Sequence, residues 1–153
     1  MDDKIVIFEE TISYKLARVA TAFRSALEKQ MKKVGLHGGQ LSVLFELWND
    51  DGLRQVDIAS RLNVKAPTVN KMLKGLVDLG LIVITRTDDD ARSSRVYLTG
   101  PGYAIREKVS EQWVELEAGY ISVITDNEQR FLLDILDKLK IAYTGIKPSL
   151  DDD

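Results

Sequence analysis

The 153-residue sequence contains no cysteine and only one histidine, His37. Without cysteine the chain cannot form disulfides, thiolate zinc sites or a cysteine redox sensor. A single histidine excludes a metal site built from several imidazoles, and the acidic residues are scattered instead of spaced as a calcium-binding loop. We therefore expect neither a metal ion nor a cofactor.

Long apolar runs are also missing, since none approaches the roughly 18–20 residues that a transmembrane helix needs. The first residues, Met1-Asp2-Asp3, carry negative charge where a secretory signal carries positive charge, and no cleavage pattern follows them. These features predict a cytoplasmic protein with no membrane segment.

Catalytic motifs are absent from the sequence as well. It contains no glycine-rich phosphate loop, no nucleophile elbow and no general base paired with a histidine. A solvated surface explains the neighbouring carboxylates of Glu9 and Glu10 and of Asp88 to Asp90. We therefore do not expect an enzyme.

What the chain does have is an uneven distribution of charge around a net value of −3. Residues 54–99 carry eight Lys or Arg against five Asp, a balance of +3. Residues 1–53 carry seven against eight acidic residues, a balance of −1, and residues 100–153 carry six against eleven, a balance of −5. Positive charge is thus concentrated in the middle of the chain, where a contact with phosphate groups would have to be.

Apolar residues that recur every three or four positions predict a mainly α-helical chain. Glycine, proline and capping residues mark where the helices begin and end. The six expected helices cover residues 4–34, 41–48, 54–62 and 66–80, the stretch from Thr99 to Tyr120, and the stretch from Thr125 to Gly145.

Residues 53–99 have the pattern of a helix-turn-helix followed by a hairpin. Asn63 suits a left-handed turn between the third and fourth helices. Alternating β-branched residues at 81–87 and 93–99 predict two strands joined by an acidic tip that ends at Arg92. A helix-turn-helix with such a hairpin, or wing, is typical of proteins that read double-stranded DNA.

The first helix is expected to extend beyond what this domain can cover, because about 30 helical residues span roughly 45 Å. Its surplus apolar face requires a partner. We therefore predict a single winged helix-turn-helix regulator over 1–153, with residues 36–99 binding DNA. Residues 3–34 and 100–145 are the expected N- and C-terminal dimerisation helices of a homodimer.

Candidate DNA-binding residues lie on the outward face of the fourth helix, at the start of the third helix and on the wing. Asn suits bidentate contact with adenine, Lys reaches guanine or phosphate, and Thr reaches phosphate or a thymine methyl group. A long cation on a narrow hairpin suits an A·T-rich minor groove, and Asp90 is expected to orient Arg92 or Arg95 by an ion pair. The full set is Arg54, Gln55, Pro67, Thr68, Asn70, Lys71, Lys74, Arg92 and Arg95.

Each of these residues also has a plainer interpretation. The polar stripe on the fourth helix is equally typical of a solvated helix face, and the wing tip of a solvent-exposed acidic turn. The aromatic residues Phe45, Trp48, Trp113 and Tyr120 are candidate ligand contacts, although aromatics at helical spacing more often belong to a core. His37 is a candidate pH sensor or ligand contact, or a local hydrogen-bonding residue of a turn.

Several motifs resemble the multiple antibiotic resistance regulator (MarR) family of bacterial transcription factors. They are GLHGGQLSVLFEL at 35–47, DIASRLNVKAPTVNKMLKGL at 57–76, and GLI followed by D-A-R and V-Y-L-T within 80–99. The match is collinear over nearly the whole chain. The chain departs from the family pattern at Ile84, where a basic residue is common, and in its three consecutive wing aspartates.

The resemblance implies an obligate homodimer with interleaved first, fifth and sixth helices, bound to a palindromic operator. It implies that the fourth helix enters the major groove and that the wing arginine reaches the minor groove. Many such proteins respond to small aromatic or anionic molecules bound between the dimer helices and the winged helix, which predicts a small-molecule effector. The alternatives are a winged-helix protein-interaction module without DNA binding, and a small-molecule-binding or enzymatic protein that uses the helical cleft.

Overall fold

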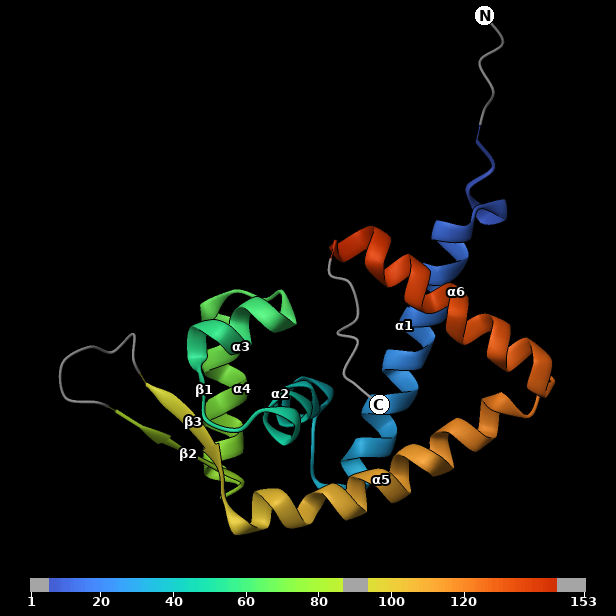
Figure 1. The fold of residues 1–153 in the computed structure, drawn as a ribbon. Coiled ribbons are helices and arrows are strands. Elements are labelled where there is room, and N and C mark those ends of the chain that lie inside the picture. The colour runs from blue at the N-terminus through green and yellow to red at the C-terminus, as the bar shows by residue number, and fades with distance from the viewer. Residues whose placement is uncertain (1–5, 87–93, 146–153) are drawn as a thin grey trace, which may run out of the picture. The chain divides into compact units, whose positions relative to one another are not determined.

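The computed structural model describes residues 6–86 and 94–145. It has the mainly helical winged-helix architecture that the sequence predicts (Figure 1). In chain order its elements are η1 (Phe8–Glu10), α1 (Ile12–Met31), η2 (Lys32–Val34), α2 (Gly38–Asn49), β1 (Leu53–Arg54), α3 (Gln55–Leu62), α4 (Ala66–Asp78), β2 (Ile82–Thr85), β3 (Arg95–Leu98), α5 (Gly100–Ile121) and α6 (Asp126–Thr144).

The chain separates into two compact units, one ending at Val114 and the other beginning at Glu115. The first unit holds the hydrophobic core, in which α2, α3 and α4 pack with the small sheet. Its most buried side chains come from these elements, from the end of α1 and from the residues that join α1 to α2: Met31, Leu36, Leu41, Val43, Leu44, Leu47, Ile58, Val69, Leu73, Leu76, Ile82 and Val96.

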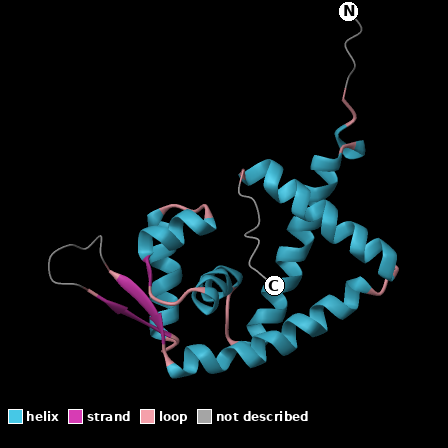
Figure 2. Cartoon of the chain, in the orientation of Figure 1, coloured by secondary structure: helices cyan, strands magenta, loops and turns pink. Residues whose placement is uncertain are grey.

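The wing is a three-stranded antiparallel sheet in the order β1-β3-β2, where the sequence predicted two strands (Figure 2). The extra strand β1 lies just before α3 and pairs Leu53 with Val96 and Arg54 with Arg95. A strand of two residues has no periodicity to detect, which is why the sequence pattern missed it. Through β1, the sheet joins the start of α3 to the strands β2 and β3.

Two predicted helix boundaries were wrong. The first helix starts at Ile12 and not at residue 4, because the Thr11 side chain caps it by accepting a hydrogen bond from Tyr14 N at 3.2 Å. The second helix starts at Gly38, inside the predicted turn 36–40, because the Gln40 side chain accepts from His37 N at 2.9 Å. The predicted stop at Gly35 is confirmed by its left-handed φ of 77°.

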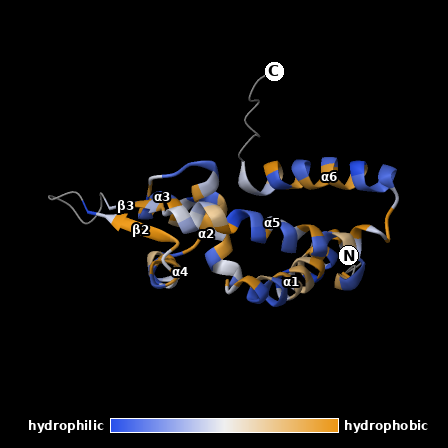
Figure 3. Cartoon of the chain, turned by 90° about the horizontal axis from the view of Figure 1, so that it is seen from below, coloured by the Kyte–Doolittle hydropathy of each residue, from blue (hydrophilic) through white to orange (hydrophobic). Residues whose placement is uncertain are grey.

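The second unit contains the end of α5 and the helix α6. The predicted capping box at the start of α6 is confirmed, since Thr125 N donates to Glu128 Oε2 at 2.7 Å and Glu128 N donates to Thr125 Oγ1 at 3.3 Å. No residue of α6 is buried in the single chain. Figure 3 shows apolar and polar residues both represented along this helix.

Candidate nucleic-acid interface

Helix α4 carries most of the predicted DNA contacts on one exposed face. Pro67 lies in its first turn, where the missing N–H interrupts no helical hydrogen bond. The opposite face is anchored in the core by Val69, Leu73 and Leu76, each at most 1% exposed. The predicted contact residues of this helix are therefore all exposed together: Pro67, Thr68, Asn70, Lys71 and Lys74.

The packing of α4 against α2 sets the position of this face. Gly39 on α2 lies so close to Met72 that a Cβ there would be 2.9 Å from the Met72 Cε. On α4, a Cβ at Gly75 would be 2.5 Å from Gln40 Nε2. Glycine at these two positions lets the helices approach closely, so that α4 is held as part of the core and its polar face is presented to solvent.

Arg54, a predicted backbone anchor, is already paired with an acidic side chain. Its Nε and Nη2 atoms donate to the two carboxylate oxygens of Asp57 at 2.8 and 2.9 Å. This hydrogen bond raises the pKa of Arg54 and lowers the pKa of Asp57. Asp57 therefore orients the Arg54 side chain, and a DNA phosphate would have to compete with Asp57 for the guanidinium group. Gln55 beside it is the first residue of α3 and is half-buried.

Arg95 is likewise held, on β3, by the turn that follows α2. Its Nη1 donates to Gly52 O at 2.8 Å, while Asp51 Oδ1 accepts from Gly52 N at 3.0 Å and from Leu98 N at 2.9 Å. Asp51 Oδ2 accepts from the Tyr103 hydroxyl of α5 at 2.8 Å, which raises the pKa of Tyr103. The Asp51–Gly52 turn thus ties the wing strand to the start of α5.

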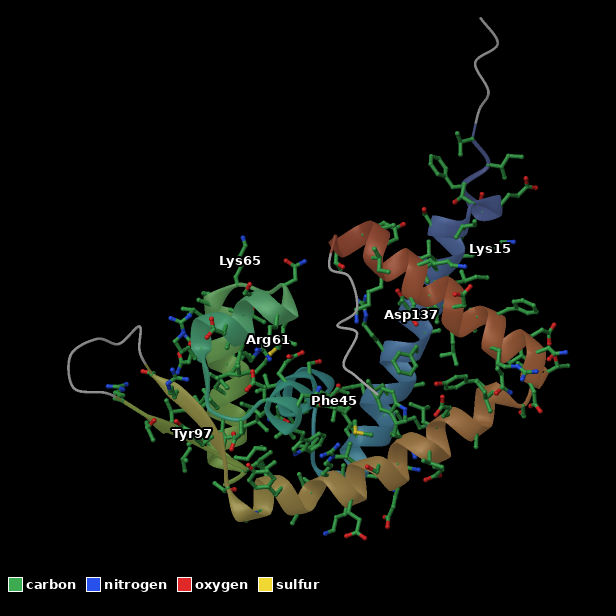
Figure 4. All side chains as sticks on the ribbon, in the orientation of Figure 1. Lys15, Phe45, Arg61, Lys65, Tyr97 and Asp137 are labelled. Atoms are coloured by element: carbon green, nitrogen blue, oxygen red, sulfur yellow. The ribbon has the colours of Figure 1, made fainter. Side chains whose placement is uncertain are left out.

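Arg92 and Asp90, the predicted wing contact and its orienting partner, lie outside the described residues. Two other exposed cations of the basic segment 54–99 were not among the predicted DNA contacts. Lys65 precedes α4 and extends away from the helices in Figure 4, and Arg86 is exposed after β2. Arg61 serves a structural role instead, since it donates to Asp50 at 2.7 Å.

Three of the predicted ligand contacts lie together in a separate cavity of about 470 Å³ between α2 and α5. Phe45 forms edge-to-face contacts with Trp48 and Trp113, at centroid distances of 5.7 and 5.5 Å. The Arg106 guanidinium lies 5.8 Å from the centroid of the Trp48 ring in the same cavity. Sequence spacing revealed the aromatic residues but not Arg106, because nothing local pairs it with Trp48.

The other two predicted ligand contacts are not part of this cavity. His37 lines a different concavity with Thr68 and Lys71. Tyr120 belongs to the second unit, where burial and the nearby Glu117 raise its pKa.

Over residues 6–86 and 94–145 no cluster of three or more His, Cys, Asp or Glu is arranged to hold a metal ion. Within the same ranges, no helix has the length and apolar character needed to cross a membrane.

The fold and its exposed α4 face define a winged helix-turn-helix of the kind that binds DNA, and comparison with known proteins agrees. The MarR family model matches residues 36–94. The HTH-type transcriptional repressor MdtR of Bacillus subtilis (strain 168) is 32% identical over 114 residues, which cover 74% of each chain.

Solved DNA complexes are also similar to this chain. The transcriptional repressor CouR bound to a 23-mer DNA duplex has a TM-score of 0.77 and 27% identity, covering 86% of this chain and 94% of CouR. The S. aureus MepR–DNA complex has a TM-score of 0.73 and 25% identity, covering 86% and 98%. The chain belongs to the MarR family of DNA-binding transcriptional regulators.

Proposed function

We propose that the protein is a repressor that binds a palindromic operator as a homodimer and is modulated by a small molecule. The observation that carries the proposal is the exposed polar face of α4, where Thr68, Asn70, Lys71 and Lys74 are all accessible. MdtR and CouR, both named as transcriptional repressors, support the direction of regulation.

In this proposal residues 36–99 bind DNA and the helices at 3–34 and 100–145 form the dimer. Asn70 reads a base, while Thr68, Lys71 and Lys74 contact phosphate groups or base edges. Arg54, Gln55 and Arg95 contribute at the edge of the interface, and Arg92, oriented by Asp90, enters the minor groove. The dimer sets the separation of the two α4 helices, which has to match about one turn of DNA, ~34–36 Å.

We expect Lys71→Ala to weaken binding to DNA of every sequence, because Lys71 neutralises a phosphate. The salt dependence of log K should become shallower by about 0.9 per protomer, or about 1.8 for the dimer. Asn70→Ala should instead lose about 1–3 kcal/mol of discrimination between operator and mixed-sequence DNA. Fluorescence anisotropy with a duplex from upstream of the chain's own gene measures both effects.

The matched control for this experiment is Lys140→Ala, which removes the same charge from an exposed position on α6. Parent and control should bind alike. If the parent binds no DNA, or if Lys71→Ala and Lys140→Ala behave identically, the proposed interface is wrong. A winged-helix protein-interaction module would then be the better explanation.

The cavity formed by Phe45, Trp48, Trp113 and Arg106 is the proposed effector site. Three aromatic rings favour a planar apolar group, and the guanidinium favours a negative charge at its edge. The combination suits an aromatic carboxylate or a related anion. CouR, which shares the fold, has been solved with p-coumaroyl-CoA bound. An effector here would lower operator affinity by favouring a conformation in which the two α4 helices are wrongly spaced.

We expect aromatic carboxylates, tested first with p-coumarate, to quench the tryptophan fluorescence of this cavity. Arg106→Ala should weaken their binding by roughly 10- to 100-fold, because a charge-assisted hydrogen bond contributes about 1.5–3 kcal/mol. Lys108→Ala is the control, since Lys108 lies on the same helix but lines a different cavity. Equal affinities for the Arg106 and Lys108 variants would contradict this assignment.

A further inference from the structure

His37 lies beside the proposed DNA-binding face and not in the aromatic cavity. It lines a concavity of about 370 Å³ between the start of α2 and the exposed face of α4. Thr68 and Lys71 of α4 line the same concavity, together with Gly39, Gln40 and Met72. A phosphate group that contacts Thr68 or Lys71 on this side would therefore lie close to the His37 ring.

The His37 ring is oriented by a carboxylate from another helix. Its Nδ1 lies 2.7 Å from Glu28 Oε1 of α1, and the second oxygen of Glu28 accepts a hydrogen bond from Gly38 N at 2.7 Å. The imidazole side chain remains 67% exposed. Because Nδ1 faces Glu28, Nε2 is the ring nitrogen available to an outside acceptor.

We propose that His37 is an additional DNA-backbone contact, which donates from a protonated Nε2 to a phosphate group next to Lys71. This rests on the proposed α4 interface and adds to it a dependence on pH. The protonated ring binds phosphate better than the neutral ring, so DNA affinity should be higher at about pH 6 than at about pH 8.5.

The charged groups beside His37 are Glu28 of α1, which its ring contacts, and Lys71 of α4, which lines the same concavity, while Lys32 acts on Glu28. The Gly38 N–H and His37 together hold the pKa of Glu28 below its ordinary value. Glu28 therefore keeps its charge from pH 6 upward, and its own contribution to stability is lost only in more acidic solution. Phosphodiester groups do not titrate between about pH 6 and about pH 8.5, and the difference between the parent and a variant without the imidazole isolates the contribution of His37.

Two substitutions separate the charge of His37 from its position. His37→Asn removes the charge but keeps a side chain that suits a helix N-cap. His37→Arg keeps a positive charge at every pH. Anisotropy titrations of the full-length protein with a labelled mixed-sequence duplex and with the upstream duplex, at about pH 6 and about pH 8.5, compare these variants with the parent and with Lys71→Ala.

At about pH 6 we expect His37→Asn to bind roughly tenfold more weakly than the parent, for a dimer with two such contacts. Its salt slope should be shallower by about 1.8. At about pH 8.5 the two proteins should bind alike, and His37→Arg should bind with little change between the two pH values. Thermal unfolding without DNA at both pH values verifies that each variant is folded.

A His37→Asn variant whose affinity follows that of the parent at both pH values overturns the inference. If Lys71→Ala still weakens binding at both pH values in that case, the α4 interface stands and only the role of His37 is wrong. If Lys71→Ala also binds like the parent, the proposed interface fails as well.

Discussion

Replacing Gly102 with alanine is expected to destabilise the winged-helix unit by about 3 kcal/mol. Gly102 is in the first turn of α5, where a Cβ would lie 2.0 Å from the carbonyl oxygen of Leu81 and 3.2 Å from Leu98 Cδ2. The Leu81 carbonyl oxygen is part of the backbone, which cannot move aside as the end of a flexible side chain can. The same residue accepts a hydrogen bond from Trp48 Nε1 at 3.0 Å, so displacing it also disturbs α2.

The measurement is thermal or urea unfolding of Gly102→Ala beside Gly100→Ala. Gly100 lies on the same helix, and a Cβ there meets nothing within 4 Å. Gly100→Ala should therefore be neutral or slightly stabilising. Equal stabilities for the two variants would show that the start of α5 does not pack against Leu81 as the structure has it.

A single charge on the apolar stripe of α6 is expected to dissociate the proposed dimer. Ile135 is 49% exposed and Phe131 is 69% exposed in the single chain, and both lie on the stripe that also includes Leu132, Leu136 and Leu139. Burying an unpaired carboxylate at a dimer interface costs several kcal/mol. Ile135→Glu should therefore weaken dimerisation at least about a hundredfold, which corresponds to about 3 kcal/mol.

Leu133 provides the matched control because it is 64% exposed on the same helix, but about 120° away from the centre of the stripe. Sedimentation velocity should find Leu133→Glu dimeric at concentrations at which Ile135→Glu is monomeric. Operator binding should be lost with the dimer, since one protomer contacts only half a site. A parent protein that is monomeric under these conditions would contradict the proposal directly.

Short-range features of the fold followed closely from the sequence. Gly35, Asn63 and the Thr125–Glu128 pair each take the predicted conformation or hydrogen bonds, because turns and caps depend on residues within a few positions. The exposed face of α4 was predictable for a related reason. An amphipathic helix has only one way to bury its apolar side against a core.

Pairings between distant residues were not predictable in this way. The sequence suggested Asp90 as a partner for Arg92 or Arg95, whereas the structure has Arg95 donating to Gly52, 43 positions away in the chain. The sequence pattern did not indicate Arg106 as a ligand contact, although its guanidinium lies over the Trp48 ring. His37 was grouped with the aromatic ligand contacts, although it lines a concavity with Thr68 and Lys71. Each of these contacts depends on how helices and strands pack, and no local pattern encodes that.

The sequence by itself determined the class of the protein, through the order of its helices, the turn chemistry between them and the concentration of positive charge at 54–99. The tertiary structure decided which cations remain available to DNA. Arg54 and Arg95 are held by Asp57 and Gly52, while Lys65, Lys71 and Lys74 are presented to solvent. The physical reason is that charge is a property of composition, whereas the availability of a charge depends on which groups folding brings within hydrogen-bonding distance.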